Sequence, residues 1–342
     1  MLVRKMVLIV TLAALALAGC GSGAATPAPT AGTGGQAQSF KVGVVKQTTH
    51  PALDAAEQGI KDAFAASGLT VEIDAQNANN DAATLTSIID GFRDKKVNLV
   101  VAIGSQPLQA AFNGLKDSGV PIVFNTVTDP YAAGAAKDKD NHPGVTGIQA
   151  LPPVRQAFDL ISEIKPGAKK VGIVWTSSEK NSEVVTGIAR DYAKSKGIEF
   201  VERTVTKADE VLAAAEALAG EKVDAIFIST DSTVVSALEA VVKVANDNGI
   251  LLVCNDPASS KRGCAAALGL DYYDNGKISV TDLAVPILKG ETTADKLQIK
   301  VQEKQNIAVN TAAAKLQGVE LPQALLDRAD KDKVYDAITP KQ

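Results

Sequence analysis

The sequence KVGVV at residues 41–45 returns as KVGIV at residues 170–174, an offset of 129 positions (41 to 170). Three further matches follow in the same order at nearly the same offset. They are GL at 68–69 with GI at 197–198, KVN at 96–98 with KVD at 222–224, and GVPIV at 119–123 with GILLV at 249–253. A chance likeness between α/β segments rarely produces four ordered matches. The sequence therefore predicts two similar lobes built in series.

Each lobe is predicted to be a doubly wound parallel sheet with helices on both faces. Runs rich in β-branched residues indicate strands at 41–45, 69–73, 99–103 and 121–124. Runs with apolar residues at helical spacing, such as 52–66 and 82–95, lie between them. Strands that alternate with helices form parallel α/β sheets. About 300 residues follow position 39, which is enough for two linked domains.

The start of the chain has the features of a lipoprotein signal. Arg4 and Lys5 precede an apolar run at 6–18, and the sequence LAGC at 17–20 matches the lipobox of bacterial lipoproteins. We expect a signal peptide at 1–19, a lipid on Cys20 and a flexible tether at 20–38. The alternative is an ordinary cleaved signal with an incidental cysteine. The expected location is extracytoplasmic, with the protein lipid-anchored to the bacterial cell membrane.

Charge and motifs argue against several classes of function. The net charge is −4 at pH 7, and no basic cluster with interleaved aromatics points to nucleic acid. The two histidines are not at metal-ligand spacing, and neither a phosphate-binding glycine loop nor a nucleophile elbow is present. We expect no metal, no cofactor and no catalysis. A hydrolase built on Ser105 or Ser177 would need a base that the sequence does not supply.

Polar loops follow the predicted strands in both halves of the chain. Ligands of open parallel sheets bind beyond the carboxyl ends of the strands, so two facing lobes would enclose a ligand between these loops. The candidate binding residues of the first lobe are Gln47, Thr48, His50, Ser105, Thr126 and Thr128. Those of the second lobe are Ser177, Asn181, Ser182, Asp231, Thr233 and Asp256.

The chemistry of these loops suits a zwitterion. Helix N-termini behind them supply N–H groups for a carboxylate. Asp231 or Asp256 could take an ammonium group, and Asp231 is the preferred choice. Helix capping is an equally good interpretation of Ser105, Ser232 and Asp81. His50 either contacts the ligand or supports the turn before the first helix.

Two cysteines lie ten positions apart, at Cys254 and Cys264. One ends a predicted strand and the other opens the next. In neighbouring parallel strands those ends lie at opposite edges of the sheet, beyond the Cα separation of about 7 Å that a disulfide tolerates. An exported protein can keep a disulfide, so the pairing stays open, but we expect two buried thiols.

Five segments resemble one protein family. They are HPALD at 50–54, TVTDP at 126–130, TDSTVVSA at 230–237, KRG at 261–263 and LDYYD at 270–274. In order, from about residue 41 to about 302, they resemble the substrate-binding proteins of ABC transporters of the tryptophan/tyrosine type.

This resemblance implies a type I periplasmic-binding-protein fold, in which a three-strand hinge joins two lobes. We place the hinge crossings near 146–151, 268–274 and 297–302. Lobe 1 is then expected at 39–147 plus about 275–300, and lobe 2 at 148–270. The C-terminal segment at 301–342 is expected to return to lobe 1.

The resemblance also implies a function without bond-making chemistry. The protein would capture a small polar ligand, most plausibly an aromatic amino acid, and deliver it to an ABC permease. Tyr272 would either stack on an aromatic ligand or pack within the hinge. Two alternatives stay open: a lipoprotein that senses the ligand and signals to a membrane receptor, or an importer component for a nucleoside, a sugar or a branched-chain amino acid.

Overall fold

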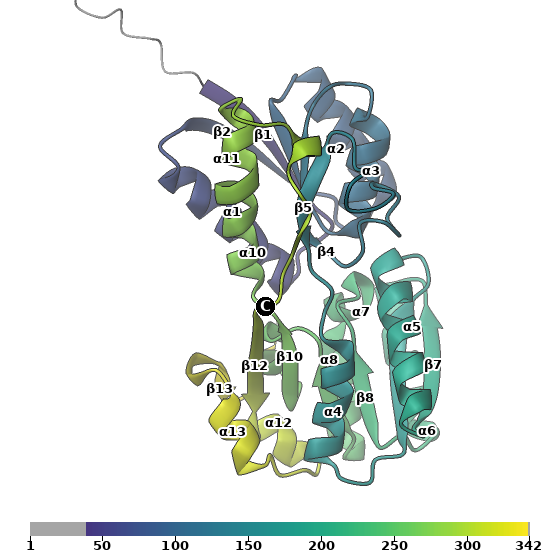
Figure 1. Ribbon diagram of the computed structural model, residues 1–342. Helices are drawn as coiled ribbons and strands as arrows, with labels where there is room; N and C mark the ends of the chain where they lie inside the picture. Colours follow the sequence, from purple (N-terminus) through teal and green to yellow (C-terminus); the bar gives the residue numbers. More distant parts are fainter. Residues whose placement is uncertain (1–38, 341–342) are drawn as a thin grey trace, which may run out of the picture. The chain divides into compact units, whose positions relative to one another are not determined.

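The computed structural model describes residues 39–340. The expected signal peptide, the lipid site at Cys20 and the tether lie outside these residues. Within the described part, no helix combines the length and the apolar character needed to cross a membrane. The part from residue 39 onward contains two sheets, one in each lobe (Figure 1).

The first lobe is built on a six-stranded parallel sheet in the order β11-β5-β4-β3-β1-β2. Its strands are β1 (Ser39–Lys46), β2 (Thr70–Asn77), β3 (Leu99–Ile103), β4 (Ile122–Val127), β5 (Val145–Gln149) and β11 (Lys300–Val301). One face packs against α2 (Ala82–Asp94) and α3 (Ser105–Leu115). The other packs against α1 (Pro51–Ala66), α10 (Tyr272–Ile278), a π-helical turn (Ser279–Ala284) and α11 (Val285–Leu288).

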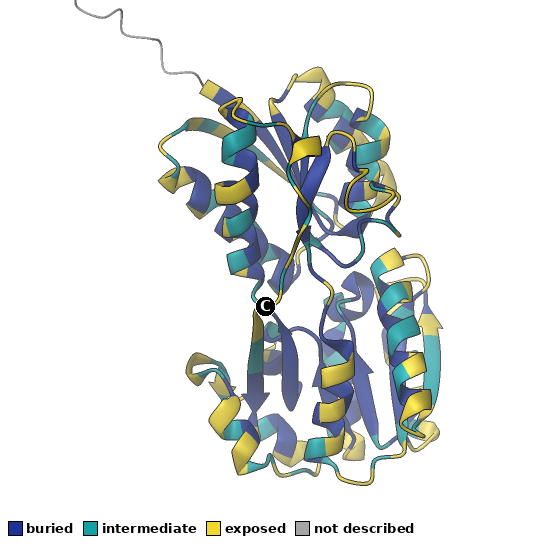
Figure 2. Ribbon diagram, viewed as in Figure 1, coloured by how far each residue is buried: buried dark blue, intermediate teal, exposed yellow. Residues whose placement is uncertain are grey.

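The second lobe has a seven-stranded sheet in the order β13-β12-β10-β9-β8-β6-β7. Its strands are β6 (Lys170–Thr176), β7 (Glu199–Val205), β8 (Ala225–Ile228), β9 (Leu251–Cys254), β10 (Ala266–Leu270), β12 (Gln305–Asn310) and β13 (Val334–Tyr335). Its helices are α4 (Val154–Ile164), α5 (Lys180–Ser195), α6 (Val211–Gly220), α7 (Ser232–Ser236), α8 (Leu238–Asn248), α9 (Ala258–Arg262), α12 (Thr311–Leu316) and α13 (Gln323–Arg328). The central strands are buried in both lobes (Figure 2).

The repeated motifs occupy equivalent places in the two lobes. The 41–45 motif lies in β1, between β2 and β3, and the 170–174 motif lies in β6, between β7 and β8. The order β2-β1-β3-β4-β5 in the first sheet therefore matches β7-β6-β8-β9-β10 in the second. The predicted α/β class and the duplicated lobe are both confirmed.

The C-terminal segment does not return to the first lobe, so that expectation for 301–342 was wrong. Only the short β11 joins the first sheet, whereas β12 pairs antiparallel with the whole of β10, from Ala266 opposite Val309 to Leu270 opposite Gln305. Val309 is fully buried there. An antiparallel strand breaks the alternation of parallel strands and crossover helices from which the lobes were predicted.

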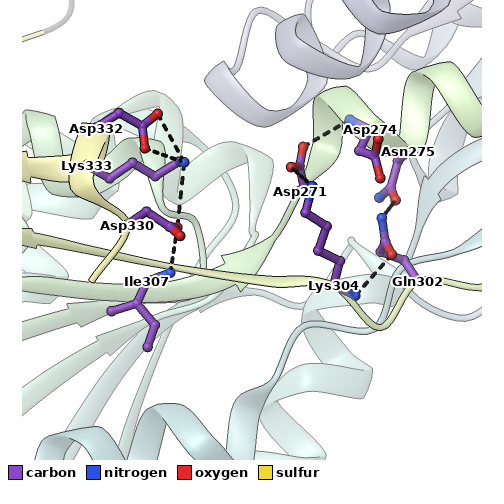
Figure 3. A network of polar contacts seen from close by, with 9 residues as sticks. All are labelled: Asp271, Asp274, Asn275, Gln302, Lys304, Ile307, Asp330, Asp332 and Lys333. Atoms are coloured by element: carbon purple, nitrogen blue, oxygen red, sulfur yellow. Dashed lines mark hydrogen bonds and ion pairs between the residues drawn. The ribbon is translucent and has the colours of Figure 1, made fainter. Parts of the chain in front are cut away.

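Two of the hinge crossings are tied to each other by polar contacts (Figure 3). Lys304 forms an ion pair of 3.0 Å with Asp271, and the Gln302 amide donates to the Asn275 side chain. Farther along, the Ile307 N–H donates to Asp330, which anchors β12. The segment between β10 and α10 and the segment between β11 and β12 therefore form one connected hinge.

Cys254 and Cys264 form a disulfide, with a Cα separation of 6.2 Å, contrary to the expectation of two thiols. The strand β9 has only four residues, and Ala266 of β10 pairs with Val253. Because the two strands overlap only here, the end of β9 lies beside the start of β10. The strand ends that were expected at opposite edges of the sheet are neighbours.

The helix α10 follows a hinge crossing and packs closely on α1. A Cβ atom on Gly276 would overlap the carbonyl oxygen of Ala56, and one on Gly59 would overlap the carbonyl oxygen of Tyr273. The two helix backbones therefore touch, and each contact requires a glycine. This contact fixes the hinge segment to the first lobe.

We predict that Gly276→Ala lowers the free energy of unfolding by about 2 to 3 kcal/mol, because the added methyl forces the two helices apart. The matched control is Gly91→Ala in α2, where nothing lies within 4 Å of the added carbon. Alanine there favours the helix and should add up to about 1 kcal/mol. Urea unfolding of the three proteins measures both changes. Equal stabilities of the two variants would contradict the proposed contact.

Candidate functional site

A cavity of about 30 Å³ lies between the carboxyl ends of the strands of the two lobes. Its lining from the first lobe is Gln47, His50, Ala52, Leu53, Gly104, Ser105, Gln106, Thr126 and Thr128. Its lining from the second lobe is Glu179, Asn181, Thr230 and Ser232. Ala150 and Tyr272 line it from beside the hinge crossings. Both lobes and the hinge therefore contribute to one site.

Seven of the thirteen predicted binding residues line this cavity. They are Gln47, His50, Ser105, Thr126, Thr128, Asn181 and Tyr272. Thr48 and Thr233 line an adjoining groove, which Gln47 and Glu179 also line. Ser177, Ser182, Asp231 and Asp256 line neither of these two spaces.

The start of α3 presents backbone donors to the cavity. Gly104 precedes this helix with φ 106°, a conformation that only glycine adopts readily, and no side chain caps the first turn. Gly104, Ser105 and Gln106 all line the cavity. An uncapped first turn leaves N–H groups and a partial positive charge available to an anion. This part of the site suits a carboxylate.

Thr126 reaches the cavity through an irregular end of β4. Its φ of 55° is in the left-handed region, which is an outlier for a β-branched residue, and the pairing of β4 with β5 shifts register between Phe124 and Val127. The Thr126 hydroxyl donates to the Asn125 side chain at 2.6 Å. Backbone strain of this kind is often kept at binding sites.

His50 has both of the roles that the sequence left open. Its Nδ1 accepts a hydrogen bond of 3.0 Å from the Ala52 N–H, so it caps α1. The same side chain is buried and lines the cavity. With Nδ1 as an acceptor, the ring carries its proton on Nε2.

Asp231, the expected partner of an ammonium group, has a structural role instead. Its carboxylate accepts from the Thr176 N–H and the Ser182 hydroxyl, both at 2.6 Å, and from the Val234 N–H at 2.9 Å. It is fully buried, and these bonds join β6, α5 and α7. Ser182 belongs to the same network. Asp256 likewise accepts from Ser259 in the turn at α9.

Glu179 is the acidic residue that the prediction missed. It lines the cavity with only 3% of its surface exposed, and it accepts from the N–H groups of Ser232 and Thr233 at 3.0 Å each. Burial, followed by repulsion from the Asp231 carboxylate, raises the pKa of Glu179 to about 7. The Glu179 carboxyl group is therefore about half protonated at pH 7.

The internal repeat contains a signal for Glu179. At the same offset of 129 positions, His50 corresponds to Glu179 (50 to 179), and each is the N-cap residue of the helix that follows the first strand of the repeat, α1 after β1 or α5 after β6. Matching the loops position by position would have paired the two residues. The prediction weighted hydroxyl and amide side chains in that loop and passed over the carboxylate.

Beside the hinge, the cavity has an apolar wall. Ala52, Leu53, Ala150 and Tyr272 line it, and Tyr272 is packed into the core of the first lobe with 5% of its surface exposed. Burial raises the pKa of the Tyr272 hydroxyl above its usual value. A neutral phenol ring among alkyl groups suits contact with an apolar or aromatic ligand group.

Comparisons with known proteins agree with this architecture. A family model described as ABC transporter substrate binding protein matches residues 41–333. The chain is 33% identical over 274 residues to a protein named tyrosine-binding protein from Clostridioides difficile (strain R20291), a match that covers 79% of this chain and 78% of the relative.

Two solved structures also match the fold of this chain. One is a protein from Streptococcus pneumonia in complex with L-Trp, with 26% identity, a TM-score of 0.80 and coverage of 85% of this chain and 99% of that one. The other is the ligand-free, open structure of a substrate binding protein from Clostridium difficile, with 30% identity, a TM-score of 0.66 and coverage of 89% and 100%. The chain superposes better on the complex than on the open structure.

We predict that Glu179→Gln changes how stability depends on pH. With a folded-state pKa of about 7 and an unfolded value near 4.5, the folded protein binds more protons between these pH values, so its free energy of unfolding falls as pH rises through them. The fall amounts to about 3 kcal/mol at about 1.4 kcal/mol per pH unit. The variant should lack this fall.

Urea unfolding at several pH values between 4.5 and 8 measures the difference between the two proteins. Glu183→Gln is the matched control, because Glu183 lies in the same helix, is exposed and pairs with Lys180. It should follow the wild-type profile. Parallel profiles for wild type and Glu179→Gln would contradict the raised pKa.

Proposed function

The chain belongs to the ABC transporter substrate-binding protein family, and on this premise we propose that its ligand is an aromatic amino acid, which it delivers to a membrane permease. Members of this family act outside the cytoplasm and bind small molecules for transport. The observation that carries the choice of ligand is the pairing, in one cavity, of an uncapped helix start with an apolar wall.

Each part of an aromatic amino acid has a matching part of the cavity. The first turn of α3 would receive the ligand carboxylate, with the Ser105 hydroxyl beside it. The wall that includes Leu53 and Tyr272 would contact the ring. The names of the relatives, a tyrosine-binding protein and a protein in complex with L-Trp, support the same choice.

Opening and closing of the lobes would give the ligand access. A cavity of about 30 Å³ holds little more than water-sized groups, so the lobes must separate before an amino acid enters. A ligand that touches both lobes favours the closed state by the difference between its affinities for the two states. The crossings between β5 and α4, β10 and α10, and β11 and β12 are where a hinge would bend.

We further propose that Cys20 carries the lipid that holds the protein at the bacterial membrane. The sequence at 17–20 supports this anchor. The disulfide between Cys254 and Cys264 supports an oxidising location, because such bonds persist mainly in exported proteins.

We predict that L-tyrosine, L-tryptophan and L-phenylalanine raise the melting temperature of the purified protein. A ligand that binds only the folded state, at about 100 times its dissociation constant, adds about 2.7 kcal/mol of stability, which corresponds to several degrees. Tyrosine amide, which lacks the carboxylate, should bind at least about tenfold more weakly. Thermal unfolding measures both the rise in melting temperature with each amino acid and the weaker effect of tyrosine amide. A rise only with nucleosides or sugars would contradict the aromatic ligand.

A further inference from the structure

Two buried carboxylates meet at the start of one short helix in the second lobe. Glu179 accepts from the N–H groups of Ser232 and Thr233, and Asp231 accepts from that of Val234. Glu179 is 3% exposed and Asp231 is fully buried. No ion pair among residues 39–340 joins either carboxylate to a lysine or an arginine. Two negative charges buried together without a cation are costly.

Two lysines close to Glu179, one in sequence and one in the adjoining groove, pair with other acids. Lys180, next to Glu179 in the chain, pairs with Glu183 at 2.8 Å. Lys207 lines the groove beside Glu179 and pairs with Asp209 at 2.9 Å. The titratable groups that line the cavity from the first lobe and the hinge are His50 and Tyr272. Neither lysine is therefore paired with Glu179.

The two carboxylates differ in where they lie relative to the cavity, because Glu179 lines it and Asp231 does not. Asp231 accepts four hydrogen bonds, from the N–H and hydroxyl of Thr176, the Ser182 hydroxyl and the Val234 N–H, so its oxygens are fully used within the lobe. Glu179 also accepts four hydrogen bonds from its own lobe, from the N–H groups of Ser232 and Thr233, the Thr233 hydroxyl and, at 3.4 Å, the Asn181 amide, but unlike Asp231 it lines the cavity. A positive group in the cavity can therefore reach Glu179, whereas it cannot reach Asp231.

A second acceptor of the same cavity has no partner. The side-chain oxygen of Gln47 makes no hydrogen bond within residues 39–340, and the residue is only 5% exposed. The Gln47 amide nitrogen already donates to Gln106 at 2.5 Å, which turns its oxygen away from that contact. Gln47 and Glu179 line both the cavity and the adjoining groove. Two acceptors from opposite lobes, one of them without a donor among the described residues, suit a ligand with several N–H groups.

We propose that Glu179 makes the site select ligands with an ammonium group, and that this ammonium displaces a proton that Glu179 holds in the ligand-free protein. This inference rests on the proposed function. The exchange is balanced: protonated Glu179 and a ligand ammonium give a carboxylate–ammonium pair, and the proton passes to solvent. The raised pKa of Glu179 agrees with a proton present before binding.

The exchange explains discrimination between ligand classes. A sugar or a nucleoside without an ammonium group would leave Glu179 to keep its proton, and would gain no ion pair in return. An amino acid replaces the proton with a cation that donates up to three hydrogen bonds, to Glu179 and to the Gln47 oxygen. Affinity for amino acids should therefore rise with pH through neutrality, because less work is needed to remove the proton.

Isothermal titration calorimetry of the wild-type protein with L-tyrosine tests the exchange directly. At each pH, the binding enthalpy is measured in buffers of different ionisation enthalpy, and the slope gives the number of protons released. With a pKa of about 7, we expect about half a proton released at pH 7, more at pH 6 and less at pH 8. The dissociation constant should fall over the same range.

Two variants assign the proton and the selectivity to Glu179. Glu179→Gln should release no proton and should bind L-tyrosine about 10- to 100-fold more weakly. It should also lose most of the preference for L-tyrosine over 3-(4-hydroxyphenyl)propionate, which lacks the ammonium group. Glu183→Gln, with an exposed carboxylate in the same helix, should match the wild type.

The outcomes separate this inference from the proposed function. If the wild type binds L-tyrosine without releasing a proton, the exchange is refuted and the ligand assignment stands. If Glu179→Gln still releases the proton, another cavity group such as His50 supplies it, and the inference is refuted. If neither L-tyrosine nor L-tryptophan nor L-phenylalanine binds, the proposed function fails and the inference fails with it.

Discussion

Parallel pairing of the strands is the constraint on which the site depends. Every strand from β1 to β5 runs in the same direction, so their carboxyl ends lie at one edge of the first sheet, and β6 to β10 do the same in the second. The loops at those ends face a shared cavity. Most of these loops, though not the one between β4 and β5, lead into a helix, so the cavity receives helix starts rather than helix ends. The polar character of the cavity therefore follows from the direction of the strands, independently of which side chains line it.

The hinge adds a second constraint, because the chain crosses between the lobes three times. The glycine contacts between α1 and α10 tie one crossing to the first lobe, and the antiparallel pairing of β12 with β10 ties another to the second. Lys304 and Asp271 then join these crossings to each other. The proposed motion between the lobes would therefore bend only the few residues of these crossings, which is the arrangement that lets two rigid bodies close on a ligand.

The buried acids of the second lobe show how position relative to the cavity separates a structural role from a ligand-binding one. Asp231 and Glu179 lie close together at the start of α7, and both are almost wholly buried. Asp231 forms its four hydrogen bonds within the lobe, and these bonds connect three secondary-structure elements. Glu179 accepts as many hydrogen bonds but lines the cavity, and no ion pair among residues 39–340 joins it to a lysine or an arginine. The same kind of group therefore stabilises the fold in one place and is available to a ligand in the other.

Patterns within the sequence determined the duplicated α/β lobes and about half of the cavity lining, because periodicity and repeats report the kind and order of the segments along the chain. Resemblance to a family supplied the three-crossing hinge. Tertiary structure alone decided three points. The antiparallel pairing of β12 depends on contacts between distant segments. The Cys254–Cys264 bond depends on the register of a four-residue strand. That Glu179 rather than Asp231 is available to a ligand depends on which side chain faces the cavity. All three depend on how strands are placed against each other or on which way a side chain faces. Composition and residue spacing along the chain do not encode either property.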